Sequence, residues 1–167
     1  DTQMLDAARR CGVAGYFYAS SVFAYPEHLQ SRPDAPPLKE EAAIPANPPI
    51  SYGWAKLVGE KAVEYAVHQD GHLRGAIFRM MNPYGPHQDI DLERGAIIPV
   101  LIRRALEYPK EPFVLRSTGE ETRSFCYISD VVDAMLLAME KLDTHQLLGP
   151  LNIGSENSIR IIELAGR

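Results

Sequence analysis

The sequence predicts an α/β fold built around a parallel sheet. Two short apolar segments, residues 15–21 and 74–80, have the length and composition of buried strands, and residues 52–69 between them have helical periodicity. A strand, a helix and a second strand in this order indicate a parallel crossover unit. The composition agrees, because 167 residues with 46% hydrophobic and 23% charged side chains are typical of one globular domain.

The segments before the crossover helix fit this unit. Residues 1–11 have the pattern of a helix, and Gly12 is placed to cap it. The strand at 15–21 ends in two serines, which would deliver hydroxyl groups to the carboxyl edge of the sheet. Seven of the thirteen prolines lie in residues 25–49, so we expect a long surface loop there without a helix or an inner strand.

The helix predicted at 52–69 carries one stripe of small and apolar residues at helical spacing, with Glu60 and Lys61 beside it. Tyr52 lies three residues before Ala55 and extends this stripe, so we expect the whole face to pack on the core. The stripe comprises Ala55, Val58, Gly59, Ala62, Val63, Ala66 and Val67.

The later part of the chain is expected to form a smaller and less regular α/β lobe. Turn-forming residues 82–86 follow the second strand. Further elements are predicted as helices at 95–106, at 129–141 with Ser129 as the N-cap and from 158 onward, and as strands at 113–116, 124–128 and 151–155.

Charge and hydropathy argue against several kinds of partner. The net charge of −5 provides no basic field for nucleic acid or for an anionic membrane. No apolar run approaches the roughly 20 residues that cross a bilayer, and no leader opens the chain, so we expect a cytoplasmic protein. Cys11, Cys126 and the five histidines lack ligand spacing, so no metal site is predicted.

Tyr52 and Lys56 are the first candidates for chemistry. Four residues apart on a helix, their side chains share a face, and an ammonium group beside a phenol favours the phenolate form, which can accept a proton. From the spacing alone, a tyrosine packed at a helix start beside a solvated lysine is the plainer interpretation.

Five motifs follow one another along nearly the whole chain. They are Ser21, then Tyr52-x-x-x-Lys56, and the segments 79–86 (RMMNPYGP), 122–130 (TRSFCYISD) and 151–155 (LNIGS). In this order they resemble the extended short-chain dehydrogenase/reductase family, specifically its NAD-dependent nucleotide-sugar epimerases and dehydratases.

The resemblance implies a division of the chain and a set of catalytic roles. Residues 1–90 would form the second half of a Rossmann-like NAD(P)-binding domain, and 91–167 mainly a substrate-binding lobe interleaved with it. Tyr52 would be the catalytic acid/base, and Lys56 would hold the nicotinamide ribose. Ser21 would hydrogen-bond the sugar hydroxyl that is oxidised.

The resemblance also implies binding residues. Asn82 would contact the substrate diphosphate and Arg123 would neutralise it, because a guanidinium offers a planar fork of donors to phosphate oxygens. Met80 would lie beside the cofactor. Taken alone, Asn82 is equally well explained as a turn residue before a proline, and for Arg123 a surface or ion-paired arginine is the better explanation.

The implied function is an NAD(P)-dependent nucleotide-sugar epimerase that works through a transient keto sugar and reversible hydride transfer. The cofactor would be NAD, with NADP possible, the substrate a nucleotide-diphosphate sugar, and the full-length protein a homodimer. Two alternatives stay open. One is a single-step NAD(P)-dependent dehydrogenase or reductase of the same family, and the other is a non-catalytic Rossmann-like binding module.

The chain departs from the family pattern at named positions. Segment 20–27 and the proline-rich loop are similar to those of GDP-mannose 3,5-epimerase-like members, but Phe23 stands where these carry an additional acid/base cysteine. Glu121 stands where the family usually has glutamine. The glycine-rich turn that binds the dinucleotide is absent, so we expect the chain to be the C-terminal part of a longer enzyme.

Overall fold

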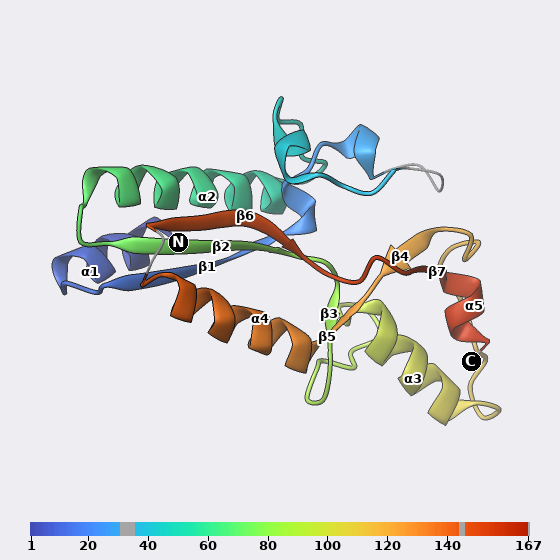
Figure 1. Cartoon of the computed structure of the whole chain (residues 1–167). Coiled ribbons are helices and arrows are strands. Elements are labelled where there is room, and N and C mark those ends of the chain that lie inside the picture. Colours follow the sequence, from blue (N-terminus) through green and yellow to red (C-terminus); the bar gives the residue numbers. More distant parts are fainter. Residues whose placement is uncertain (31–35, 144–145, 167) are drawn as a thin grey trace.

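The centre of the computed structural model, which describes residues 1–30, 36–143 and 146–166, is a parallel sheet (Figure 1). Among these residues the sheet has three strands in the order β1-β2-β6, namely β1 (Gly15–Ser21), β2 (Arg74–Met80) and β6 (Leu147–Ile153). Both pairings are parallel. The predicted α/β fold with its parallel crossover is therefore confirmed.

Helices cover both faces of the sheet. The long α2 (Ser51–Gln69) lies along one face and α4 (Ile128–Lys141) along the other (Figure 1). Side chains alternate along β2 accordingly, since Ile77 packs towards α2 while Ala76 and Phe78 pack towards α4. The first helix, α1 (Thr2–Arg10), contacts α2 and ends before Gly12, whose φ of +66° suits a residue without a β-carbon.

The face of α2 that packs on the sheet is rotated from the predicted stripe. Ala55 and Val58 are exposed, and Tyr52 is 48% exposed, so the expectation that Tyr52 extends a buried stripe is wrong. Small residues occur around most of this helix, so they do not define one buried face. The buried face is the one that carries Glu60, because the Glu60 carboxylate pairs with the Arg79 guanidinium in the sheet. The buried residues are Gly53, Leu57, Gly59, Glu60, Val63, Ala66 and Val67.

The described parts of the proline-rich segment, 25–30 and 36–49, are irregular, as predicted, with short 3-10 turns at η2 (Glu27–Leu29) and η3 (Glu40–Ala43). They are packed rather than freely exposed. Tyr25 and Ala43 are fully buried beside Leu57 of α2. The segment therefore contributes side chains to the hydrophobic core beside the N-terminal part of α2.

The second half of the chain forms small paired strands beyond the sheet (Figure 1). Two parallel strands are β3 (Pro83–Tyr84) and β5 (Cys126–Tyr127), and two antiparallel ones are β4 (Thr122–Ser124) and β7 (Ser158–Arg160). The accompanying helices are α3 (Ile97–Glu107) and α5 (Ile161–Ala165).

Several predicted boundaries in this half are wrong. Residues 113–116 form no strand, and the predicted strand at 124–128 is divided between β4, β5 and the start of α4. Residues 158–160 pair with β4 as a strand, so the last helix begins at Ile161 and not at 158. The strand expected at 151–155 begins earlier, at Leu147. Tyr127, not Ser129, occupies the N-cap of α4.

The described residues show neither a membrane-spanning helix nor a metal-binding cluster. Within the ranges given above, no helix is both long and apolar enough to cross a bilayer. The same residues contain no group of three or more histidine, cysteine or acidic side chains placed to hold a metal ion.

Candidate active site

A cavity of about 460 Å³ opens at the carboxyl ends of β1 and β2. This is the edge at which open parallel sheets bind their ligands. The cavity brings together residues that are far apart in the sequence, and their roles stay predictions. All six predicted site residues line it: Ser21, Tyr52, Lys56, Met80, Asn82 and Arg123.

Ser21 and Tyr52 approach each other through the turn that follows β1. The Ser21 Oγ accepts a hydrogen bond of 3.3 Å from the main-chain nitrogen of Phe23. The Phe23 ring packs edge-on against Tyr52, with 6.0 Å between ring centroids. Gly53 makes this approach possible, because a β-carbon there would lie 2.0 Å from the Phe23 carbonyl oxygen.

Lys56 bridges α2 and the end of β1. Its Nζ donates a hydrogen bond of 2.8 Å to the carbonyl oxygen of Ala19. The same atom lies 5.6 Å from the centroid of the Tyr52 ring and 5.4 Å from that of Tyr18. The ammonium group is therefore held beside the phenol ring of Tyr52 by a main-chain contact.

The two tyrosines near Lys56 differ in their surroundings. Burial, followed by the negative charge of Glu60, raises the pKa of Tyr18 to about 12, and its hydroxyl donates a 2.8 Å hydrogen bond to Asp1 Oδ2. Tyr18 therefore stays protonated at neutral pH. Tyr52 lines the cavity and is half exposed, which leaves it as the tyrosine that a ligand can reach.

Asn82 fixes the path of the chain after β2. Its backbone is left-handed, with φ of +44°, a conformation that asparagine tolerates better than most residues. The side-chain Nδ2 donates a 2.9 Å hydrogen bond to the carbonyl oxygen of Ser124, the last residue of β4. Asn82 is thus a turn residue that also lines the cavity, and its predicted diphosphate contact stays a prediction.

Arg123 brings a positive charge to the cavity from β4. Its Nη1 donates to the carbonyl oxygen of Thr122 at 3.2 Å. Glu121, the departure from the family pattern, does not line the cavity and accepts a 2.5 Å hydrogen bond from Ser117 Oγ. That bond is the main cause that lowers the pKa of Glu121, with a smaller contribution from Arg123. The carboxylate is therefore turned towards Ser117.

Part of the cavity wall is formed by residues that were not predicted from the sequence, among them Gln88. The Gln88 Nε2 donates to the Pro83 carbonyl oxygen at 3.3 Å, while its Oε1 is buried without a hydrogen-bond partner among the described residues. No periodicity marks this glutamine in the sequence, which explains the omission. The additional apolar lining comprises Phe23, Tyr84, Ile97, Pro99 and Phe125.

A protein-family model matches most of this chain. The model described as the NAD dependent epimerase/dehydratase family matches residues 1–154. The chain belongs to this family. The resemblance inferred from the five motifs is thereby confirmed.

Relatives within the epimerase/dehydratase family extend the comparison. The chain is 33% identical over 162 residues to GDP-mannose 3,5-epimerase from Arabidopsis thaliana, a match that covers 97% of this chain and 41% of that protein. It is similar to the structure of UDP-glucose 4-epimerase from Thermotoga maritima with UDP-glucose, at a TM-score of 0.80 and 29% identity over 98% of this chain and 48% of that one.

A third family member carries two ligands. UDP-glucuronic acid 4-epimerase from Bacillus cereus, in complex with UDP-glucuronic acid and NAD, matches at a TM-score of 0.75 and 26% identity, over 98% of this chain and 47% of that chain. The chain therefore spans less than half the length of each of these three epimerases.

Proposed function

We propose that the full-length protein is an NAD(P)-dependent nucleotide-sugar epimerase. The observation that carries the proposal is the convergence of Ser21, Tyr52 and Lys56 on one cavity at the carboxyl edge of a parallel sheet. Epimerases of the same family that bind UDP-glucose, or UDP-glucuronic acid with NAD, share this fold.

The residues present fit one part of the cofactor. The ammonium of Lys56 and the hydroxyl of Tyr52 line the cavity together with Met80, and they offer a cation, a polar group and an apolar surface to a nicotinamide riboside. The chain has no glycine-rich turn for the pyrophosphate. NAD, when bound, would accept a hydride from the sugar and return it.

The residues of this chain would move the proton. Tyr52 would accept the proton of the sugar hydroxyl as the carbonyl forms and return it after the keto sugar has presented its other face. Ser21 would hold that hydroxyl by a hydrogen bond. Lys56, with Nζ 5.6 Å from the Tyr52 ring, would stabilise the phenolate form of Tyr52, which accepts that proton and is formed again when the proton is returned.

Arg123 would hold the substrate by its diphosphate. A guanidinium in the cavity wall matches two phosphate oxygens at once, which orients the sugar towards the other end of the cavity. We propose on this basis that residues 91–167, to which Arg123 belongs, form mainly the substrate-binding lobe.

The first test is turnover by the full-length protein. UDP- and GDP-sugars are incubated with NAD, and epimers are separated by chromatography while reduced cofactor is followed by absorbance. An epimerase forms epimers without net reduction, whereas a dehydrogenase or reductase changes the cofactor in proportion to product. Tyr52→Phe should lose about 10²–10⁴-fold in kcat. Wild-type kcat in this variant would remove Tyr52 from the mechanism.

We propose further that the full-length protein is a homodimer that pairs through α2. Trp54, Val58 and Tyr65 are 44%, 59% and 67% exposed and follow one side of this helix, an apolar surface suited to a second copy. Val58→Asp should convert the dimer to a monomer in sedimentation experiments, because it buries a charge in that surface. A wild-type monomer at micromolar concentration would contradict the proposal.

A further inference from the structure

Three polar residues form a row across the sheet, one position before the strands end. Ser20 pairs with Arg79 and Arg79 pairs with Asn152, so the three lie side by side on β1, β2 and β6. The next residues along β1 and β2 are Ser21 and Met80, which line the cavity. The row therefore lies directly beneath the candidate active site.

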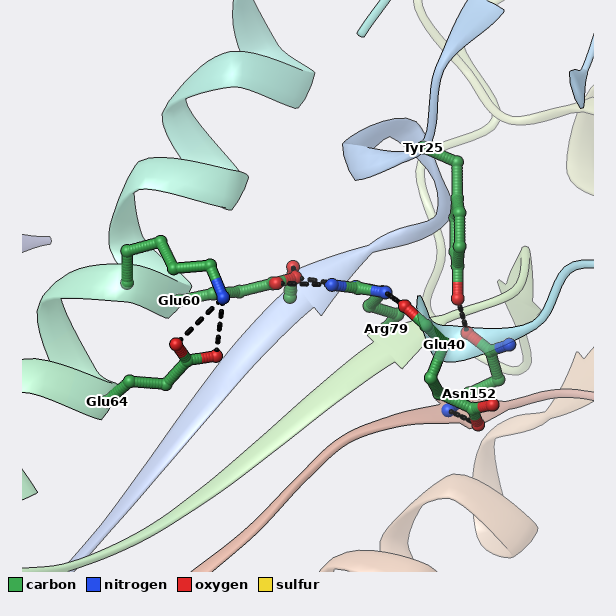
Figure 2. Close-up of polar contacts among 8 residues, drawn as sticks. Tyr25, Glu40, Glu60, Glu64, Arg79 and Asn152 are labelled. Atoms are coloured by element: carbon green, nitrogen blue, oxygen red, sulfur yellow. Dashed lines mark hydrogen bonds and ion pairs between the residues drawn. The ribbon is translucent and has the colours of Figure 1, made fainter. Parts of the chain in front are cut away.

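Glu60 of α2 covers this row with a buried charge. Figure 2 shows its carboxylate facing the Arg79 guanidinium, with two hydrogen bonds of 2.9 Å from Nε and 2.7 Å from Nη2. Glu60 is 0% exposed and Arg79 2% exposed, and the Ser20 hydroxyl donates to the same carboxylate. Burial is the largest single influence on the pKa of Arg79 and opposes its charge, but the hydrogen bonds and charges of Glu60 and Tyr25 together outweigh burial and raise this pKa.

Arg79 also joins the sheet to the proline-rich segment. Its Nη1 donates to the Glu40 carbonyl oxygen at 2.7 Å, and its guanidinium carbon lies 4.7 Å from the centroid of the Tyr25 ring. The Tyr25 hydroxyl donates to Asn152 Oδ1 at 2.7 Å, and the Asn152 main-chain nitrogen donates to Glu40 Oε1 at 3.0 Å (Figure 2). The Arg79 guanidinium thus contacts both α2 and the proline-rich segment that precedes α2 in the chain.

Stability alone is a weak explanation for such a pair. Burying two charges carries a large desolvation penalty, and apolar residues of similar volume often do as well or better. A bidentate arginine–carboxylate pair does supply what an apolar contact lacks, namely a fixed distance and orientation between two elements. The pair is therefore suited to set geometry.

The pair joins α2 to β2, and the Ser20 hydroxyl joins the same Glu60 carboxylate to β1, the strand that carries Ser21. Glu60 lies one helical turn after Lys56 on α2, and Ser20 directly precedes Ser21 on β1. A translation of α2 along the sheet would move Lys56 relative to Ser21, and both hydrogen bonds from Arg79 to Glu60 oppose that translation.

We propose that Glu60 and Arg79 are positioning residues that set the distance between Ser21 on β1 and the Tyr52–Lys56 pair on α2. This role rests on the proposed function, since it concerns proton transfer by Tyr52. A displacement of about 1 Å in a reacting group costs on the order of 10²-fold in rate. The pair would thus act on the chemical step and leave substrate binding to Arg123.

The first experiment compares Glu60→Gln with Glu64→Gln in the full-length protein. Glu64 is one turn further along α2 and pairs with Lys61 at 2.8 Å on the surface, which makes it a matched control (Figure 2). Glu60→Gln should lower kcat by roughly 10–100-fold and change KM for the sugar nucleotide by less than about threefold. Glu64→Gln should leave both constants unchanged. Unchanged kcat in Glu60→Gln would overturn the proposal.

A second variant covers the case in which Glu60→Gln fails to fold. The double variant Glu60→Gln with Arg79→Met leaves no uncompensated charge and keeps the volume, so its melting temperature should be near that of the wild type. Its kcat should stay low, because the bidentate link is absent. Recovery of both melting temperature and kcat would show a purely structural pair and overturn the proposal.

The outcomes separate this role from the proposed function. A wild type that turns over no sugar nucleotide rejects the proposed function and the positioning role with it. An active wild type with an inactive Tyr52→Phe variant supports the proposed function, and unaffected Glu60 variants then reject the positioning role alone.

Discussion

Arg123 lines the cavity and is the residue to which we assign the diphosphate of the proposed substrate. Within the described part of the chain, its guanidinium has no carboxylate at ion-pair distance, and the nearby Glu121 is bound to Ser117. A positive charge in a cavity wall that has no carboxylate partner among the described residues is suited to an anionic ligand.

Replacement of this arginine should weaken diphosphate binding selectively. In the full-length protein, Arg123→Ala should reduce the affinity for UDP or GDP by about 1.5–3 kcal/mol, the usual value of a hydrogen bond to a charged group, and leave NAD binding unchanged. Calorimetric titration measures both. Arg160→Ala is the control, because Arg160 is on the paired strand β7 and bonds to Glu120 and Glu163. An equal loss for NAD would contradict the assignment.

Sequence motifs predicted which residues surround the cavity but missed the residues behind it. Tyr52 and Lys56 are recognisable from their local spacing together with the order of the motifs along the chain, and Ser21 from its place in that order. The helical periodicity places Glu60 beside the apolar stripe predicted on residues 52–69, and a glutamate at such a position is usually solvated. The available signal was Arg79, a charge inside an otherwise apolar strand, which requires a buried partner but does not identify it.

At the scale of elements, the contact between α2 and β1 depends on Gly59. A β-carbon on Gly59 would lie 2.0 Å from the Tyr18 hydroxyl oxygen and 2.4 Å from the ring carbon that bears it. The Tyr18 ring cannot easily move, because it is buried and hydrogen-bonded to Asp1. The main chain of α2 at Gly59 therefore packs directly against the Tyr18 side chain of β1.

Gly59→Ala should therefore destabilise the protein even though alanine favours helices. We expect a loss of about 1–3 kcal/mol in the free energy of unfolding, typical of overpacking, measured by urea denaturation of the full-length protein. Gly71→Ala is the matched control, since a β-carbon there meets no atom within 4 Å. Greater stability of Gly59→Ala would show that α2 can move away from β1.

Long elements were predictable and short ones were not. Residues 74–80 and 52–69 carry enough periodicity to indicate the crossover unit within one or two residues of its observed bounds. The strands β4 and β7 have three residues each, and they are strands because they pair with each other across the fold. Such pairing is a tertiary property that a window of sequence does not contain.

For the whole molecule, the sheet order mixes the two ends of the chain. β6 comes from residues 147–153 and pairs with β2, so residues beyond 90 share one sheet with residues before 90. The cavity likewise combines β1 and α2 with Arg123 from β4. The proposed cofactor and substrate halves are thus interleaved in the fold.

The 167 residues expressed alone should bind NAD too weakly to measure. The dinucleotide pyrophosphate normally binds a glycine-rich turn and the helix N-terminus behind it, and this sequence contains no such turn. Titration of NAD and NADP into the purified chain, followed by calorimetry, tests this, with the full-length protein as the positive control. Micromolar binding to the isolated chain would reveal a cofactor site in other residues.

The row formed by Ser20, Arg79 and Asn152 has a consequence for folding. Apolar strands tolerate a slide of two residues, because their faces repeat with that period. Such a slide of β2 would move Arg79 by about 6.6 Å along the sheet, away from Glu60, and leave two buried charges unpaired at a cost of several kcal/mol. Misaligned sheets are thereby disfavoured, and the alignment that survives is the one that assembles the cavity.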